Sequence, residues 1–308
     1  MKNLIFLVGT IFLLVAMSCE KERLLSQSSE KDWQKIDLQA GYIGDLKKII
    51  SLDDEVIVFS QAACWASKDL KHWEERAIPD RDLTPDYSDG PFPVLFQGKM
   101  YINGKDGLYY SNDAGQSWIS GFKTQIEVVA ADENWLYIFQ AHGSYRSSDG
   151  ICFQPLVGLD NIIRPVLRKP NIYLTFGKAE EGKVVLSGIW NTGMEYEFTS
   201  HDAGLTWQSS STLLVNDVVS DVKVLNNHSG FYFIATGPIE INKKGGIFWS
   251  AEKLDNDYYY AGESEEKGII VKNNFESTFV FPEKIRELKV IGSKLFAVGD
   301  KGALYVYE

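Results

Sequence analysis

Short apolar runs bounded by turn residues recur along the whole chain. Examples are EVIVFSQ at 55–61, KMYINGK at 99–105, NWLYIFQ at 134–140, NIYLTFG at 171–177, GFYFIAT at 230–236 and KLFAVGD at 294–300. They are rich in Val, Ile, Phe and Tyr, and their alternating or continuous apolar patterns are typical of β-strands. Gly, Asn and Asp mark the turns between them. The stretch 68–78 admits a helical interpretation, but its place in the repeat described next favours a turn and a strand. The pattern predicts an all-β chain.

Five stretches of the chain align with one another. They are ACWASKDLKHW at 63–73, GLYYSNDAGQSW at 107–118, GSYRSSDGICF at 143–153, MEYEFTSHDAGLTW at 194–207 and GIFWSAEKL at 246–254. Their aligned serines lie 44, 36, 53 and 50 residues apart, a mean of about 46. Repeats of this size built from short strands are typical of β-propeller blades. The 276 residues from Trp33 to Glu308 then predict six blades, with seven as the alternative.

The two ends of this region complement each other. KGALYVYE at 301–308 matches the strand before the repeated motif, and KDWQKIDL at 31–38 matches the strand after it. We therefore expect an N-terminal strand to complete the last blade and close the ring, which removes a sheet edge. Residues 262–283 fit the repeat poorly. They are either a long excursion between blades or a seventh, thinner blade.

Two copies keep the full template Ser-x-Asp-x-Gly-x-(Ser/Thr)-Trp, and each of its positions has a structural task. The Asp carboxylate can accept backbone N–H groups of a turn, and the Gly allows a positive φ. The Trp starts the next strand and buries apolar surface. The predicted structural residues are Ser67, Asp69, Trp73, Ser111, Asp113, Gly115, Trp118, Ser147, Asp149, Ser200, Asp202, Gly204 and Trp207.

The segments SNDAGQSW and SHDAGLTW resemble the Asp-box, also called the bacterial neuraminidase (BNR) repeat. The resemblance covers about five of six repeats and implies a sialidase-like β-propeller with four-stranded blades. In that family the box joins the third and fourth strands, on the outer rim, and faces away from the end of the ring that binds ligands. Because the box occurs in sialidases, other glycosidases, receptors and assembly factors, it carries little information about activity.

The N-terminus is typical of a bacterial lipoprotein. Lys2 precedes an apolar run at 4–17 that is too short to span a bilayer comfortably. Ser18 and Cys19 then resemble a lipobox, in which the cysteine is acylated; an ordinary signal peptide cut nearby is the alternative. We expect a signal peptide at 1–18, a polar tether at 19–32 and one propeller domain at 33–308. The protein would then be extracytoplasmic, held by a lipid anchor to a bacterial membrane. The outer membrane is favoured, with either a periplasmic or a surface-exposed position.

Composition narrows the range of partners. The chain has a formal net charge of −11, and without Lys2 the part from Cys19 carries 30 basic against 42 acidic residues, or −12. The absence of a Lys/Arg cluster argues against nucleic acid, and we expect membrane contact through the lipid alone. The four histidines and the cysteines after Cys19 show no metal-ligand or disulfide spacing. The sequence predicts no metal and no cofactor, and leaves the partner as an unidentified protein or glycan.

A sialidase-like site, as the resemblance implies it, needs three converging arginines, a Tyr-Glu nucleophile pair and an acid-base Asp. Arg164 precedes a Pro at the start of the fourth repeat, and Arg286 lies at the start of a later one. The loop 80–93 brings acidic residues, of which Asp86 and Asp89 are candidates for a general acid or a calcium site. A structural ion pair for Arg164 and a solvated acidic loop are the competing interpretations. The aromatic run 258–260 is more typical of core packing than of a sugar platform.

These observations favour a non-catalytic, lipid-anchored propeller that binds a protein or a glycan. A sialidase-like glycoside hydrolase is the first alternative, and an assembly factor for a membrane complex is the second. Whether the protein is an enzyme is left open by the sequence, with the balance against it.

Overall fold

The computed structural model describes most of the chain from Trp33 onward. The described residues are 33–38, 44–79, 93–140, 143–159, 172–190, 195–211, 214–219, 222–226, 232–236, 239–243, 247–264, 266–273 and 277–308. The predicted signal peptide, the lipidation residue Cys19 and the tether at 19–32 lie outside this range, so they remain predictions.

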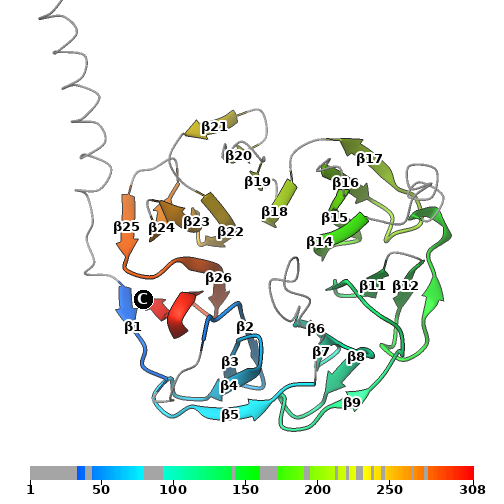
Figure 1. Cartoon of the computed structure of the whole chain (residues 1–308), viewed down its shortest axis with the longest axis horizontal. Helices are drawn as coiled ribbons and strands as arrows, with labels where there is room; N and C mark the ends of the chain where they lie inside the picture. Colours follow the sequence, from blue (N-terminus) through cyan, green and yellow to red (C-terminus); the bar gives the residue numbers. More distant parts are fainter. Residues whose placement is uncertain are drawn as a thin grey trace, which may run out of the picture.

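Strands of these residues form seven four-stranded antiparallel sheets around a central axis (Figure 1). The all-β propeller expected from the repeats is therefore confirmed. The number of sheets is seven, which is the alternative to the six predicted from the mean repeat length. We number the blades I to VII in the order in which the chain forms them.

Each blade is built from four strands, with the first strand innermost. Blade I contains β2 (Lys48–Leu52), β3 (Glu55–Phe59), β4 (Ala63–Ser67) and β5 (Glu74–Ala77). Blade II contains β6 (Val94–Phe96), β7 (Lys99–Gly104), β8 (Gly107–Ser111) and β9 (Ile119–Ser120). Blade III contains β10 (Val128–Ala131), β11 (Leu136–Gln140), β12 (Gly143–Ser147) and β13 (Gln154–Pro155). Blade IV contains β14 (Ile172–Glu180), β15 (Lys183–Trp190), β16 (Glu195–Ser200) and β17 (Gln208–Ser211).

The second half of the ring follows the same order. Blade V contains β18 (Leu214–Val219), β19 (Val222–Asn226), β20 (Tyr232–Thr236) and β21 (Ile239–Lys243). Blade VI contains β22 (Ile247–Leu254), β23 (Asp257–Ser264), β24 (Lys267–Lys272) and β25 (Ser277–Phe281). Blade VII contains β26 (Ile285–Ile291), β27 (Lys294–Gly299), β28 (Leu304–Tyr307) and the N-terminal β1 (Trp33–Lys35), with the short 3-10 helix η2 (Asp300–Gly302) between β27 and β28.

Blade VI explains why residues 262–283 fit the repeat poorly. These residues are the end of β23, then β24 and β25, and they form most of a separate sheet with β22. The strands of this blade are long and its sequence lacks the Ser-Asp turn, so the repeat pattern does not mark it as a separate unit. The alternative of a seventh blade is thus correct. This blade has four strands like the others, so it is not the thinner blade that the sequence suggested.

The ring is closed as the sequence predicted. Strand β1 pairs antiparallel with β28, with Trp33 opposite Tyr307. The Trp33 indole packs at 5.3 to 6.1 Å, ring centroid to centroid, from Phe279, Phe281 and Tyr307. Because these rings come from the two ends of the chain and from blade VI, the clasp also ties blade VII to its neighbour.

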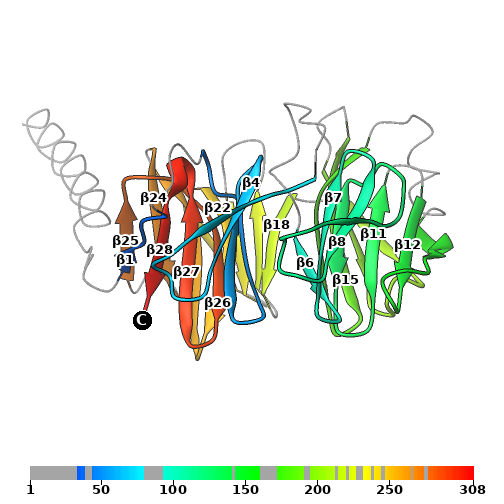
Figure 2. The ribbon, with the colours of Figure 1, turned by 90° about the horizontal axis from the view of Figure 1, so that it is seen from below.

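The antiparallel order gives the ring two distinct ends. The turns between first and second strands and between third and fourth strands lie at one end, which we call the turn end. The starts of the first strands and the loops between second and third strands lie at the other, which we call the mouth. In the side view, η2 lies at the mouth and the C-terminus at the turn end (Figure 2).

The core lies between adjacent blades rather than in one centre. Fully buried side chains such as Tyr137, Phe139 and Phe198 join blades III and IV. Tyr259 and Tyr260 are 2% and 1% exposed, so these two members of the aromatic run at 258–260 are core residues, as the sequence favoured.

Candidate functional site

The Ser-Asp turns of blades I to IV connect the third strand to the fourth. Each of the serines at 67, 111, 147 and 200 ends its third strand and is buried. In the full copies the Asp carboxylate accepts a backbone N–H four residues on, from Ser117 to Asp113 at 2.9 Å and from Thr206 to Asp202 at 2.8 Å. In the shortened copies the same oxygen accepts N–H groups two and three residues on. The carboxylate therefore still caps the turn in the two copies that have lost one turn residue.

The backbone of the full turns requires residues that tolerate a positive φ. Ala114 and Gly115 have φ of 54° and 88°, and Ala203 and Gly204 have 56° and 82°. The Ser111 hydroxyl accepts the Gly115 N–H at 2.7 Å, which holds the turn from its other side. The carboxylate and hydroxyl oxygens of these turns therefore accept hydrogen bonds from their own turn, which supports a structural role for this motif.

The carboxylates of these turns are strongly acidic. The Ser117 hydroxyl, the Ser111 hydroxyl and the Ser117 amide lower the pKa of Asp113 to about 2. The Thr206 hydroxyl and amide lower the pKa of Asp202 to about 2 in the same way. A permanently ionised carboxylate of this kind cannot act as a general acid near neutral pH.

The full turns of blades II and IV also bind the preceding blade, which the sequence did not reveal. Arg76 of blade I donates to the Ala114 carbonyl oxygen at 2.7 Å, and Arg146 of blade III donates to the Ala203 carbonyl oxygen at 2.6 Å. The Trp118 indole N–H reaches back to the Ala77 carbonyl oxygen at 2.9 Å. Each of these turns therefore fixes its own hairpin and the junction to the blade before it.

One of the five aligned copies is not such a turn. Ser250 lies in β22, the innermost strand of blade VI, rather than at the end of a third strand. Its hydroxyl accepts the Leu288 N–H of blade VII at 3.1 Å. The alignment of 246–254 with the repeat was therefore wrong. The aromatic-x-Ser pattern at 248–250 occurs here in an inner strand instead of at the end of a third strand.

The inner strands of blades IV to VII contain an irregularity that those of blades I to III lack. The register shifts at residue 175 in β14, 216 in β18, 249 in β22 and 286 in β26. A β-bulge re-aims the side chain of the extra residue and is enriched near functional sites. In β22 and β26 the extra residues are Trp249 and Arg286, which lie close to the mouth.

Arg286 is held in place by two contacts. Its guanidinium lies 4.4 Å from the Trp249 ring centroid, and its Nε and Nη2 donate to the two Asp300 carboxylate oxygens at 2.6 and 3.0 Å. This stacked, bidentate arrangement is the geometry that arginine favours and lysine cannot reproduce. It joins blade VI to blade VII, so Arg286 has a structural role in addition to any contact with a ligand.

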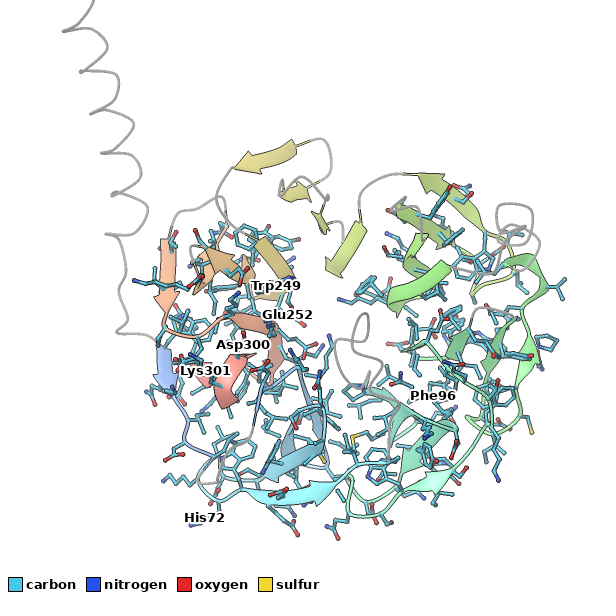
Figure 3. All side chains as sticks on the ribbon, viewed as in Figure 1. His72, Phe96, Trp249, Glu252, Asp300 and Lys301 are labelled. Atoms are coloured by element: carbon cyan, nitrogen blue, oxygen red, sulfur yellow. The ribbon has the colours of Figure 1, made fainter. Side chains whose placement is uncertain are left out.

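The inner strands surround a cavity of about 530 Å³ on the ring axis. Its charged lining residues are Lys48, Lys178, Glu252, Glu287 and Lys289. In Figure 3, Trp249 and Glu252 lie at the inner side of the ring, whereas His72 lies at its outer edge. This is the candidate functional site, because it is concave and combines apolar walls with a few converging polar groups.

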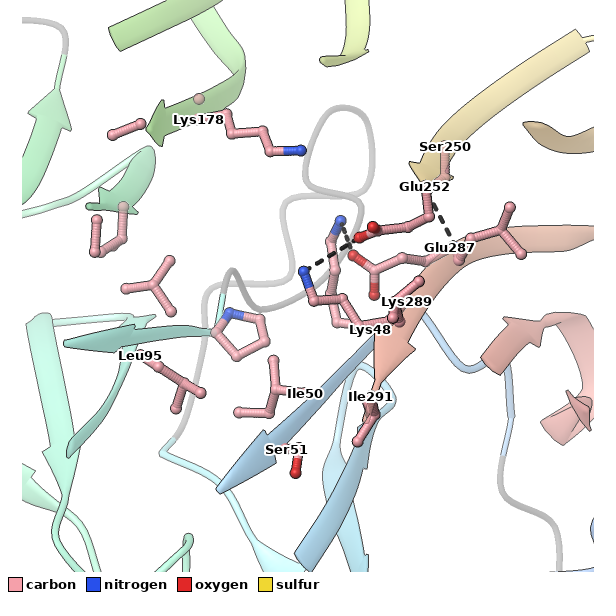
Figure 4. Close-up of a pocket in the computed structure, with 18 of the residues that line it drawn as sticks. Lys48, Ile50, Ser51, Leu95, Lys178, Ser250, Glu252, Glu287, Lys289 and Ile291 are labelled. Atoms are coloured by element: carbon pink, nitrogen blue, oxygen red, sulfur yellow. Dashed lines mark hydrogen bonds and ion pairs between the residues drawn. The ribbon is translucent and has the colours of Figure 1, made fainter. Parts of the chain in front are cut away.

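Ion pairs between blades order one side of this cavity (Figure 4). Lys48 of blade I lies 3.0 Å from a Glu287 oxygen of blade VII, and Lys289 of blade VII lies 3.2 Å from a Glu252 oxygen of blade VI. The second Glu287 oxygen accepts the Ile49 N–H at 2.7 Å. Both carboxylates are therefore positioned by neighbouring blades before any ligand arrives.

Glu127 is a further carboxylate, half-buried and just before the inner strand of blade III. It accepts the Leu174 N–H of blade IV at 2.9 Å, and burial raises its pKa to about 7 despite this bond. It therefore titrates near neutral pH at a blade junction.

The other catalytic candidates cannot be placed. Arg164, Asp86 and Asp89 lie outside the described residues, so their convergence with Arg286 is untested. Within the described part of the chain, no group of three His, Cys, Asp or Glu side chains is arranged to hold a metal ion. Helices long and apolar enough to cross a membrane are likewise not found there.

Comparisons with known proteins establish the fold. No protein-family profile matches the chain, and no curated protein matches it in sequence. Solved structures similar to it include the extracellular domain of the putative one-component system BT4673 from B. thetaiotaomicron, at 10% identity and a TM-score of 0.62 over 90% of this chain. The chain spans only 40% of the length of that structure.

Two further structures are similar over most of both chains. A catalytically inactive variant of virginiamycin B lyase from Staphylococcus aureus, solved with quinupristin, has 8% identity and a TM-score of 0.62, over 89% of this chain and 98% of that one. BamB from Moraxella catarrhalis has 11% identity and a TM-score of 0.51, over 85% of each chain. At such low identity these similarities show the β-propeller fold alone.

Sequence reasoning did not identify the cavity residues. Lys48 lies in β2, Glu252 in β22, and both Glu287 and Lys289 in β26, with no shared motif. A usable signal was present in the inner strands themselves, where charged residues interrupt otherwise apolar runs such as FWSAEKL at 248–254.

Proposed function

We propose that this protein is a lipid-anchored, extracytoplasmic β-propeller that binds a protein or glycan ligand at its central cavity without transforming it. The observation that carries the proposal is the pairing of the cavity carboxylates. Glu252 and Glu287 each contact a lysine of a neighbouring blade. Side chains that are held by ion pairs to a neighbouring blade are positioned in advance, which suits a fixed recognition surface.

The location is supported by the sequence and the fold together. Similar structures include an extracellular domain, and the N-terminus resembles a lipoprotein signal. Strand β1 begins at Trp33, which pairs with Tyr307 at the turn end. An anchor at Cys19 would therefore attach at the end with the Asp-box-like turns and leave the mouth open to ligands.

The binding role can be tested with the full chain and an obstructed cavity. Ala179 is half-buried and lines the cavity, so Ala179→Trp should fill it; Ile119→Trp, on the outer strand β9, is the matched control. We expect saturable binding to a glycan array or to an extracted surface protein that is lost in the first variant and kept in the second. A panel of fluorogenic glycosides should show no turnover.

The opposite outcome would favour the hydrolase. Turnover of any glycoside that falls in Glu252→Gln or Ala179→Trp, but not in Ile119→Trp, would contradict a purely binding role.

The anchor has its own test. Labelling with a palmitate analogue should be abolished in Cys19→Ala and unchanged in Cys152→Ala, which removes the exposed cysteine of the blade III turn. Labelling and membrane partitioning that persist in the first variant would refute acylation at Cys19.

A further inference from the structure

Trp249 places an aromatic ring on the wall of the central cavity. It is the extra residue at the bulge of β22, it is partly buried, and it lines the cavity. The Arg286 guanidinium packs on this ring at 4.4 Å from its centroid and is itself fixed by both carboxylate oxygens of Asp300. Neither Arg286 nor Asp300 is among the described residues that line the cavity, so the indole lies between them and the open space. The ring is therefore held in position from behind, with its other side toward a ligand.

The wall beside Trp249 offers hydrogen-bond donors and acceptors next to each other. One ion pair joins Glu252 to Lys289. A second joins Glu287 to Lys48, and the ends of the four side chains lie together (Figure 4). The charges of each pair are compensated within the protein, so this wall does not require a charged ligand. Each ionised carboxylate has about four lone-pair positions, and it can therefore accept further hydrogen bonds beside its lysine.

Hydroxyl groups match such a wall better than a charged group does. A hydroxyl donates and accepts at one oxygen atom, so it can donate to a carboxylate and accept from the neighbouring ammonium group at the same time. Adjacent hydroxyls on a sugar ring can do this in pairs. A sugar ring also has an apolar face, and its C–H hydrogens suit the negative face of an aromatic ring. A saccharide therefore combines the two kinds of group that this wall recognises.

The spacing of the two features fits more than one sugar ring. Trp249 and Glu252 are three residues apart in β22, and a strand rises about 3.3 Å per residue, so they are separated by about 10 Å along the wall. This is about the length of two linked sugar rings. The cavity of about 530 Å³ lies within the range of small-molecule sites, and Leu95 and Phe176 on its opposite wall add apolar contacts.

The geometry points to a neutral saccharide of at least two rings as the ligand of this cavity. One ring would stack on Trp249, and hydroxyls of the next ring would bond to the ion pairs of Glu252 and Glu287. The inference rests on the proposed binding function and specifies its ligand. Two sources offer the same groups, namely a free disaccharide and the end of a longer glycan chain.

Calorimetric titration of the full chain measures this binding. The probes are four neutral disaccharides: cellobiose, lactose, maltose and N,N′-diacetylchitobiose. We expect at least one of them to bind with a dissociation constant below about 1 mM. The uronic acid that corresponds to it, with a carboxylate in place of one hydroxymethyl group, should bind no more tightly, because the charges of the wall are already paired.

Trp249→Leu tests the stacking contact. It removes the aromatic face but keeps an apolar side chain, and it should weaken disaccharide binding at least about tenfold. Trp135→Leu is the matched control and should bind as the parent does. Trp135 is also partly buried and packs on an arginine, with Arg146 at 4.0 Å from its ring centroid, but it is not among the described residues that line the cavity. Trp249→Phe keeps an aromatic ring and should retain most of the affinity.

Glu252→Gln tests the recognition of hydroxyls. The variant keeps an acceptor oxygen but loses the charge, and the affinity should fall about tenfold because hydrogen bonds to charged groups are the stronger ones. Glu263→Gln is the matched control and should bind as the parent does. Both glutamates belong to blade VI, both side chains are 16% exposed, and each pairs with a lysine in or just before β26. Glu263 is not among the described residues that line the cavity.

A tetrasaccharide of the preferred sugar separates the two sources. Binding at least as tight as that of the disaccharide indicates the end of a glycan chain, and weaker binding indicates a free disaccharide. Circular dichroism melts verify that each variant is folded, and if Trp249→Leu does not fold, the comparison of Glu252→Gln with Glu263→Gln decides.

The inference is overturned if no probe binds, if the uronic acid binds more tightly, or if a folded Trp249→Leu or Glu252→Gln variant binds as the parent does. If no probe binds while Ala179→Trp still abolishes binding of a surface protein, the proposed function stands and only the ligand class is wrong.

Discussion

Two parts of the ring hold their blades together by different means. Between blades I and II and between blades III and IV, Arg76 and Arg146 donate to carbonyls of the next blade at the Ser-Asp turns. Between blades VI, VII and I, side chains of one inner strand contact the next, as Glu287 contacts Ile49. The repeated motif therefore stabilises one side of the molecule, and the other side carries its charged contacts in the channel.

This difference bears on where in the ring a functional site lies. In blades I to III the inner strands β2, β6 and β10 are short and regular. In blades IV to VII the inner strands are longer and contain a bulge, although blade IV keeps the Ser-Asp turn. Both groups of blades line the cavity, and its printed ion pairs lie where blades VI, VII and I meet.

The largest expected effect concerns Arg76 at the first rim junction. Its side chain is 5% exposed and pairs with Glu55, which is 11% exposed, at 2.7 Å. Arg76→Met should lower the free energy of unfolding by about 3–5 kcal/mol, because Glu55 loses its buried partner and Ala114 its donor. Urea denaturation followed by tryptophan fluorescence measures this. Glu74→Gln, at a 65% exposed partner, is the control. A loss below about 1 kcal/mol would show that the rim contacts are dispensable.

Glu127 gives the next effect and tests the junction of blades III and IV, which uses both kinds of contact. Its folded-state pKa of about 7 lies above the ordinary 4.5. Protonation therefore stabilises the fold fully below about pH 4.5, and this stability is lost as the pH rises through 7.

Glu127→Gln keeps an acceptor for the Leu174 N–H but carries no charge. The variant should exceed the parent by about 1–3 kcal/mol at pH 8 and match it near pH 4. Thermal melts across this range measure the difference. A constant offset at all pH values would contradict burial as the cause.

Asp113 tests the turn itself, with an effect of intermediate size. Asp113→Ala should cost about 1–2 kcal/mol, because the turn amide of Ser117 loses its acceptor. Asp106→Ala, at an exposed loop residue of the same blade, is the control. Because the folded-state pKa of about 2 is lowered, the contribution of Asp113 is complete above pH 4 and is lost as the pH falls toward 2. Acid unfolding that is identical in parent and variant would refute the turn role.

The smallest expected effect is a difference of about 1 kcal/mol between the alanine variants of two aligned serines. Ser111 accepts two turn amides and donates to Asp113, whereas Ser250 accepts one amide across a blade junction. Ser111→Ala should therefore cost about 2 kcal/mol and Ser250→Ala about 1 kcal/mol. Equal costs in denaturant titrations would mean that the alignment of the two positions reflects a shared role after all.

The sequence was sufficient for most of the fold because local patterns encode it. Alternating apolar runs located the strands, Trp33 predicted the clasp, and the Asp and Gly positions located four turns. It failed where no local pattern exists. Blade VI has no turn motif, so the mean repeat length predicted one blade too few. The cavity charges are brought together only by ring closure, which joins Lys48 near one end of the chain to Glu287 near the other.

Amide hydrogen exchange of a Glu287→Ala variant tests most directly the claim that the two groups of junctions are held by separate contacts. The account predicts faster exchange at Ile49 and in its strand β2, because the acceptor is lost, with no change at the Gly115 and Ser117 amides of the blade II turn. Unchanged exchange at Ile49, or equal acceleration at the turn amides, would contradict it.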